Sequence, residues 1–136
     1  SRKMLILGRE IGLPLEMSDV NIKDFLPEAC LKAESIPAFY EELEKHEPYF
    51  SSFKNEAENS GRKLRLIGVL EDGKINIEVQ IVDANHPFFG LSGSDNIISF
   101  TTSRYKNTPL VVKGPGAGAE VTAAGVFADL VRVTAQ

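Results

Sequence analysis

Three absences narrow the kinds of protein that this 136-residue sequence can encode. It has one cysteine, Cys30, which excludes an internal disulfide and fits a reducing compartment such as the cytoplasm. No apolar run approaches the roughly 20 residues that a membrane-spanning helix needs, and no secretory signal stands at the start. Basic residues are outnumbered, because 15 Lys and Arg stand against 19 Asp and Glu. The net charge of −4 argues against a surface for nucleic acid or anionic membranes.

The residues that are present indicate a single folded domain. Hydrophobic residues make up 43% of the chain and charged residues 25%, which is ordinary for a globular protein. A chain of 136 residues is also long enough to bury a real core. The sequence has no internal repeat and no low-complexity segment. Its organisation must therefore be inferred from its helix and strand signals.

The sequence opens on a pattern typical of an amphipathic helix. In "SRKMLILGREIG", Met4, Leu7 and Ile11 recur at helical spacing, and the helix is expected to end near Gly12. Ser1 could serve as its N-cap, but no residue before it sets an entry turn. We therefore expect a chain cut inside or just before a helix, and hence a piece of a larger protein.

Prolines and glycines divide the segment that follows. Pro14 and Pro27 break its first part, which predicts a loop with short helical turns. From Ser35, a favoured N-cap residue type, aromatic and apolar residues at helical spacing predict two helices that meet near Pro48. The second of these helices is expected to end at Gly61.

The hydrophobic period then changes to that of strands. Asp72-Gly73 is typical of a two-residue hairpin turn. After it, apolar residues alternate with polar ones from Ile75 to Ile81, so we expect one face to meet a core and the other to meet water or a polar interface. Ser94–Asn96 predicts a turn into a third strand, "NIISFTTSRY", and "PLVVKG" predicts a fourth. The order of elements predicts an α+β fold, with a mostly antiparallel four-stranded sheet covered by helices on one face.

The segment "AEVTAAGVFADLVRV", residues 119–133, predicts a helix that is apolar on nearly all sides. Its only polar residues are Glu120, Thr122, Asp129 and Arg132. Such a helix is normally buried on nearly every side, and a single four-stranded sheet cannot provide that cover. We therefore expect a partner chain or another domain to cover it.

Gly114, Gly116 and Gly118 stand between the last strand and the last helix, where a phosphate-binding loop would stand. The dinucleotide motif G-x-G-x-x-G fails, because Val121 occupies its last position. A glycine cluster more often serves a tight strand-to-helix connection. Two interpretations stay open: the glycines serve packing alone, or backbone amides at the helix N-terminus contact a nucleotide held mainly by other protein.

Few other residues indicate chemistry. Lys3, next to Arg2 at the chain start, is by default solvated surface. His86 fits a structural hydrogen bond or an interface contact better than a zinc site, because only His46 accompanies it. His46 lies between charged neighbours and predicts exposed helix surface, whereas Cys30 predicts a small buried residue. No metal site is predicted.

Four segments give the sequence a resemblance to a known family. In chain order they are "SRKMLILGREIG", "LRLIGVLEDGKINIEV", "NHPFFGLSGSDNIISFTTSRY" and "PLVVKGPGAGAEVTAAGVFADL". Over essentially its full length, the sequence resembles homoserine dehydrogenase. The run "GAGAEVTAAGVFADL" is the most specific part. It is similar to the C-terminal signature of the bifunctional aspartokinase–homoserine dehydrogenases and of the fungal enzymes.

The resemblance implies an oxidoreductase that uses NAD or NADP to interconvert aspartate semialdehyde and homoserine. It also implies that residues 1–113 are the catalytic and dimerisation domain, truncated at its N-terminal side. Residues 114–136 would be a glycine loop and a helix that return to a Rossmann domain outside this chain. "SRK" matches the end of the family's D-x-x-x-K pattern, which implies that Lys3 is the catalytic lysine. Gly118 matches a family glycine that touches the nucleotide.

The resemblance further implies a small-molecule substrate and a homodimer formed through the sheet. Two hypotheses follow: the 136 residues alone are inactive, because they carry half of a substrate site, and they still dimerise. The alternative is a stand-alone ligand-binding or oligomerisation module without catalysis. Such a module should have a capped first helix and an amphipathic last helix, and this sequence shows neither in convincing form.

Overall fold

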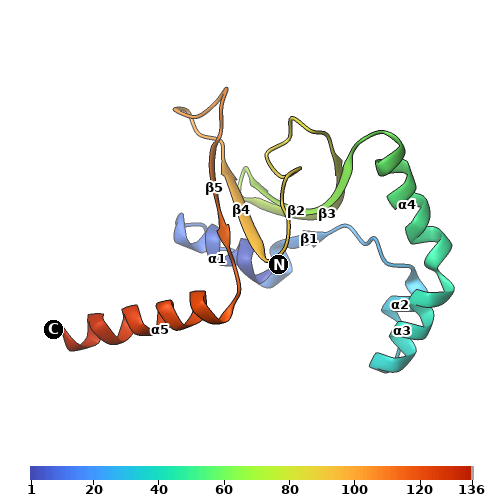
Figure 1. Cartoon of the computed structure of the whole chain (residues 1–136), viewed down its shortest axis with the longest axis horizontal. Coiled ribbons are helices and arrows are strands. Elements are labelled where there is room, and N and C mark those ends of the chain that lie inside the picture. Colours follow the sequence, from blue (N-terminus) through green and yellow to red (C-terminus); the bar gives the residue numbers. More distant parts are fainter. Residues whose placement is uncertain (136) are drawn as a thin grey trace. The chain divides into compact units, whose positions relative to one another are not determined.

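Residues 1–135 are described by a computed structural model, whose elements are labelled in Figure 1. The chain divides into two compact units, one from Ser1 to Asp83 and one from Ala84 onward. The first unit holds helices and a three-stranded sheet, and the second holds two strands and a long helix. Among the described residues, no helix is long and apolar enough to cross a membrane.

The first unit begins with helix α1, Arg2–Glu10. Its end agrees with the prediction, because Ile11 caps it and Gly12 follows with a φ of +88°. Leu5 and Gly8 form its buried face. A one-turn 3-10 helix, η1 (Met17–Asp19), comes next in the segment that was predicted as loop with short turns.

Three helices follow: α2 (Glu28–Leu31), α3 (Ile36–Lys45) and α4 (Glu47–Asn59). Ser35 caps α3 as predicted, since its Oγ accepts a hydrogen bond from the Ala38 N–H at 3.3 Å. The junction near Pro48 is confirmed, because α3 ends at Lys45, His46 caps both helices and Pro48 lies in the first turn of α4. Gly61, with a φ of +65°, follows the end of α4.

The sheet of the first unit has the order β1-β3-β2. Strands β2 (Lys63–Glu71) and β3 (Lys74–Val82) form the predicted antiparallel hairpin, and β1 (Val20–Ile22) lies parallel to β3. Asp72 and Gly73 have φ values of +50° and +73°, which is the conformation that a tight two-residue hairpin turn requires.

The core of the first unit lies between α1 and one face of this sheet. Leu5 and Leu15 pack there against Ile75 and Ile77, and Ile75 has no solvent-exposed surface. Helix α1 can approach β2 closely because Gly68 has no Cβ atom. A Cβ atom at this position would lie only 2.7 Å from Met4 Cγ. The alternation predicted for β3 is therefore confirmed at Ile75 and Ile77.

The opposite face of the sheet is not purely polar, which corrects the two-sided pattern expected from β3 alone. By register, Ile67 and Val82 lie on this opposite face, and both are buried. Ala57 of α4 is also buried, and α4 contacts β2. Ile67 of β2, Val82 of β3 and Ala57 of α4 thus give the sheet a second, smaller buried area.

The second unit contains strands β4 (Asp95–Phe100) and β5 (Leu110–Pro115), which pair antiparallel, and helix α5 (Ala119–Thr134). The α+β class is confirmed, but the single four-stranded sheet is wrong. All four predicted strands form, yet the last two pair with each other in a sheet of their own, and β1 joins the first two. β1 was not predicted, because a three-residue strand is too short to show the alternation of apolar and polar residues that marks a strand.

Candidate functional site

Lys3 lies in the first turn of α1 and is exposed. Packing of Leu5 and Gly8 against the sheet fixes the helix that carries it. The first turn contains no acidic residue, and Arg2 stands beside Lys3. The positive end of the helix dipole adds to these two charges. This end of α1 therefore suits an anionic or electron-rich oxygen, such as a carboxylate or a polarised carbonyl.

Gly118 directly precedes α5 and has a φ of +140° and a ψ of +153°. This conformation is essentially restricted to glycine. A Cβ atom at this position would have open space around it, so a ligand can approach the backbone closely. The backbone at Gly118 is therefore open to close approach by another molecule.

The charge at the start of α5 limits what can bind there. No side chain caps the helix at Gly118, and Thr122 Oγ1 donates to the Gly118 carbonyl at 2.9 Å. Glu120 lies in the first turn, where a carboxylate interacts favourably with the positive end of the helix dipole. Repulsion from Glu120 disfavours a phosphate group here and leaves the neutral parts of a nucleotide as the better fit.

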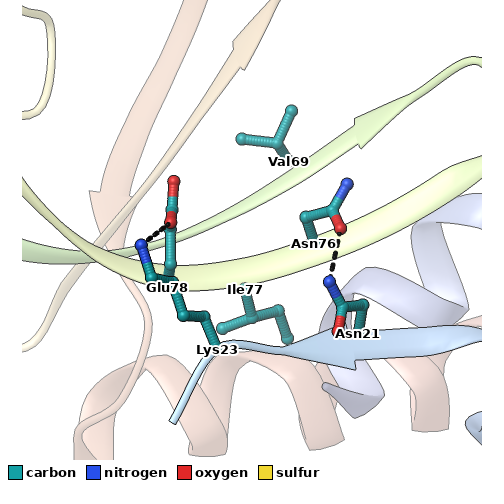
Figure 2. A pocket seen from close by; sticks show the side chains of 6 residues that line it. All are labelled: Asn21, Lys23, Val69, Asn76, Ile77 and Glu78. Atoms are coloured by element: carbon teal, nitrogen blue, oxygen red, sulfur yellow. Dashed lines mark hydrogen bonds and ion pairs between the residues drawn. The ribbon is translucent and has the colours of Figure 1, made fainter. Parts of the chain in front are cut away.

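The sheet of the first unit carries a hollow on the face opposite α1, with a polar lining (Figure 2). Asn21 Nδ2 donates to Asn76 Oδ1 at 3.0 Å, and Lys23 Nζ lies 3.5 Å from Glu78 Oε2. In Figure 2, Val69, Asn76 and Glu78 lie on the side of β3 away from Ile77. These polar groups satisfy one another and join β1 to β3, so the hollow is a structural link. Lys3 and Gly118 do not line it.

The two histidines and the cysteine have structural surroundings. His86 Nδ1 accepts a hydrogen bond from the Phe88 N–H at 3.1 Å, as the prediction of a structural histidine requires. His46 is half-buried, and its Nδ1 lies 2.8 Å from the Glu42 carbonyl oxygen, so the prediction of an exposed His46 was wrong. His46 is the C-cap of α3, and the Glu42 carbonyl oxygen also accepts the His46 backbone N–H at 3.2 Å. Cys30 is buried as predicted, with 2% of its surface exposed.

Asn96 is a residue whose importance the sequence did not indicate. The sequence predicted that it ends a turn and begins the third strand, and it does belong to β4; what the sequence did not show is that its carboxamide lies against Gly116 of the glycine segment, residues 114–118. The close contact links positions that are 20 residues apart, so no local pattern could reveal it. Among residues 1–135, no group of three or more His, Cys, Asp or Glu side chains could hold a metal ion.

Comparison with known proteins gives one consistent result. Residues 1–131 match the family model described as homoserine dehydrogenase. A bifunctional aspartokinase/homoserine dehydrogenase 1, chloroplastic, from Zea mays is 46% identical over 136 residues, which covers 98% of this chain and 15% of the maize protein. The homoserine dehydrogenase of Schizosaccharomyces pombe is 40% identical over 139 residues, covering 100% of this chain and 37% of that protein.

A solved structure supports the fold. A Candida auris protein of unknown function matches 99% of this chain with a TM-score of 0.79 and 34% sequence identity, and the match covers 38% of that protein. The chain thus spans 15% of the length of the maize relative and 37% of the length of the fission-yeast relative. The family match over residues 1–131 and these identities show that the chain belongs to the homoserine dehydrogenase family.

Proposed function

We propose that these 136 residues are part of an oxidoreductase that reduces aspartate semialdehyde to homoserine with NADPH or NADH. The family match over residues 1–131, which begins at the helix carrying Lys3, is the observation that supports this most. In this proposal residues 1–113 act on the substrate, and residues 114–136 return to a nucleotide-binding domain. This functional division is separate from the structural one, which falls at Asp83.

Lys3 is the proposed proton donor. The nicotinamide group, when bound, supplies a hydride to the aldehyde carbon. Lys3 Nζ then gives a proton to the carbonyl oxygen, so that the aldehyde becomes an alcohol without leaving an alkoxide. Arg2 and the positive end of α1 favour negative charge on that oxygen during the step.

Gly118 is the proposed nucleotide contact within this chain. Its glycine-only conformation and the open space beside its Cα support close approach of a ligand. Glu120 makes a sugar or ring contact more favourable than a phosphate contact. The remaining nucleotide contacts would come from residues outside the chain, and we therefore expect no homoserine-dependent NADP reduction by the 136 residues alone.

A chimera tests the role of Lys3. These 136 residues would replace the matching segment of the Schizosaccharomyces pombe homoserine dehydrogenase, which is 40% identical. Loss of a general acid should lower kcat of Lys3→Met by about 10²–10⁴-fold and change KM little. Lys106→Met, at an exposed loop position, is the matched control. A Lys3→Met chimera with kcat within about twofold of the parent would refute the assignment, because general acids rarely contribute so little.

The second unit is the proposed dimer surface. By register, Ile98 and Phe100 of β4 share one face with Leu110 and Val112 of β5. Phe100, Leu110 and Val112 are between 39% and 53% exposed. A two-stranded sheet is at best marginally stable alone, so an identical sheet from a second copy would stabilise it.

Sedimentation velocity of the 136-residue chain tests this surface. We expect a dimer for the parent chain and a monomer for Val112→Asp, because the charge would be buried at the interface. Val111→Asp places the same charge on the other face of β5 and should stay dimeric. A parent chain that remains monomeric at high concentration would count against the proposal, and in favour of a surface used by other parts of the enzyme.

A further inference from the structure

The glycine segment is held by a side chain from β4. A Cβ atom added to Gly116 would lie 1.5 Å from Asn96 Nδ2, 2.4 Å from its Cγ and 3.0 Å from its Oδ1. Real Cβ atoms essentially never approach other atoms within 3.0 Å. The Asn96 carboxamide therefore fills the space in which any other residue at position 116 would place its side chain.

Backbone conformation does not explain the glycine at position 116. Gly118 has a φ of +140°, which strains other residues, whereas Gly116 is not among the residues with positive φ. A positive φ therefore does not require glycine at position 116, whereas the Asn96 carboxamide supplies the three atoms nearest to a Cβ placed there. The two glycines therefore have different roles. Gly118 allows a backbone conformation that other residues avoid, and Gly116 leaves room for the Asn96 carboxamide.

Further contacts join the same two segments. Asn96 pairs with Gly114 in the register of β4 and β5. The Gly116 N–H donates to the Ser94 carbonyl oxygen at 2.9 Å. Lys113 Nζ lies 3.1 Å from Asp95 Oδ2. The chain is therefore fixed against β4 up to a point two residues before Gly118.

We propose that Asn96 is a positioning residue for the nucleotide: its carboxamide packs on Gly116 and thereby sets the place of Gly118 and of the first turn of α5. This inference rests on the proposed nucleotide contact at Gly118. It extends the nucleotide site to a residue outside the glycine segment. It also explains the glycine at position 116 by its contact with Asn96 and not by a contact with the nucleotide. Asn96 acts through the backbone of the segment and does not itself have to touch the nucleotide.

A double-mutant cycle in the chimera tests the inference. Asn96→Ala removes the carboxamide, and Gly116→Ala displaces it. Either change should weaken NADPH binding about fivefold to tenfold, the effect of losing roughly one favourable contact. KM for NADPH should rise while kcat stays nearly constant, since the contact is made equally in ground and transition states. In the Asn96→Ala background, Gly116→Ala should cause no further loss.

Gly90→Ala is the matched control, because Gly90 lies in the same unit and likewise lacks a positive φ, but a Cβ atom there would meet open space instead of Asn96. It should leave NADPH affinity unchanged. Equal NADPH affinity in Asn96→Ala and the parent overturns the inference while leaving the proposed function intact. A Gly116→Ala loss that is just as large without the carboxamide also overturns it, because Gly116 would then serve the nucleotide directly.

A readout without nucleotide separates the two proposals. In the 136-residue chain, NMR should show that Gly116→Ala shifts the Asn96 side-chain amide signals and that Asn96→Ala shifts the Gly118 amide. If the parent chimera binds no NADPH, the proposed function fails and the nucleotide part of the inference fails with it. Shifted Asn96 and Gly118 signals would still support the packing of Asn96 on the glycine segment, and unchanged signals would overturn it.

Discussion

Replacing Ile75 by alanine should strongly destabilise the first unit. Ile75 has no exposed surface and packs in the cluster of Leu5, Leu15 and Ile77. The change removes Cγ1, Cγ2 and Cδ1, which at about 0.8 kcal/mol per buried carbon amounts to about 2.4 kcal/mol. The cavity left in a tightly packed site raises the expected loss in the free energy of unfolding to about 4 kcal/mol, within the range of about 2–5 kcal/mol for such changes.

The assay must report on the first unit alone, because two units need not unfold in one transition. A urea titration followed by the amide NMR signals of β2 and β3 meets this requirement. Ile36→Ala is the matched control, since Ile36 is 74% exposed and the same atoms should contribute less than about 0.5 kcal/mol there. A loss below about 1 kcal/mol for Ile75→Ala would mean that the cluster under α1 is not the core of this unit, because buried truncations cost more.

Two further predictions concern local structure. Gly73→Ala should destabilise the hairpin by about 1–2 kcal/mol, because Gly73 has a φ of +73°, and the same urea titration measures it. The hydrogen bond from Lys45 Nζ to Glu42 Oε1, at 2.6 Å, lowers the pKa of Glu42, and the Glu42 hydrogen bond raises the pKa of Lys45. The pair therefore stabilises α3 between the unfolded-state pKa values of Glu42 and Lys45, and this stabilisation is lost as pH falls through the lowered pKa of Glu42 or rises through the raised pKa of Lys45. NMR titration of Lys45→Met should show a higher pKa for Glu42, and an unchanged value would contradict the assigned cause.

The elements that the sequence predicts correctly are those set by local chemistry. Gly12 and Gly61 follow helix ends with positive φ, and Ser35 caps α3. Asp72-Gly73 makes the turn that its residue types favour. Each of these features depends on a few neighbouring residues, so a single sequence contains all the information required.

The features that the sequence did not reveal depend on contacts between distant segments. β1 becomes a strand because its three residues pair with Ile75–Ile77, more than 50 positions later. That pairing also brings Asn21 to Asn76 and completes the hollow of Figure 2. Ile67 of β2 and Val82, the last residue of β3, are buried on the face that Asn76, Glu78 and Gln80 mark as polar. The local pattern of apolar and polar residues does not determine which strands pair with each other.

The three glycines of the glycine segment can be assigned different roles only from the residues around them in the structure. Gly114, Gly116 and Gly118 look equivalent in the sequence, but the structure distinguishes them. A Cβ atom at Gly114 would meet open space, and one at Gly116 would collide with the Asn96 carboxamide. At Gly118 the φ of +140° would strain any residue with a side chain. Alanine should therefore leave the stability of the second unit nearly unchanged at position 114 and lower it at position 118 by about 1–3 kcal/mol. At position 116 the loss should disappear when Asn96 is also alanine. Thermal unfolding of the three variants, followed by β4 and β5 amide signals, measures this order. Equal losses at all three positions would mean that the glycines serve one shared tight connection.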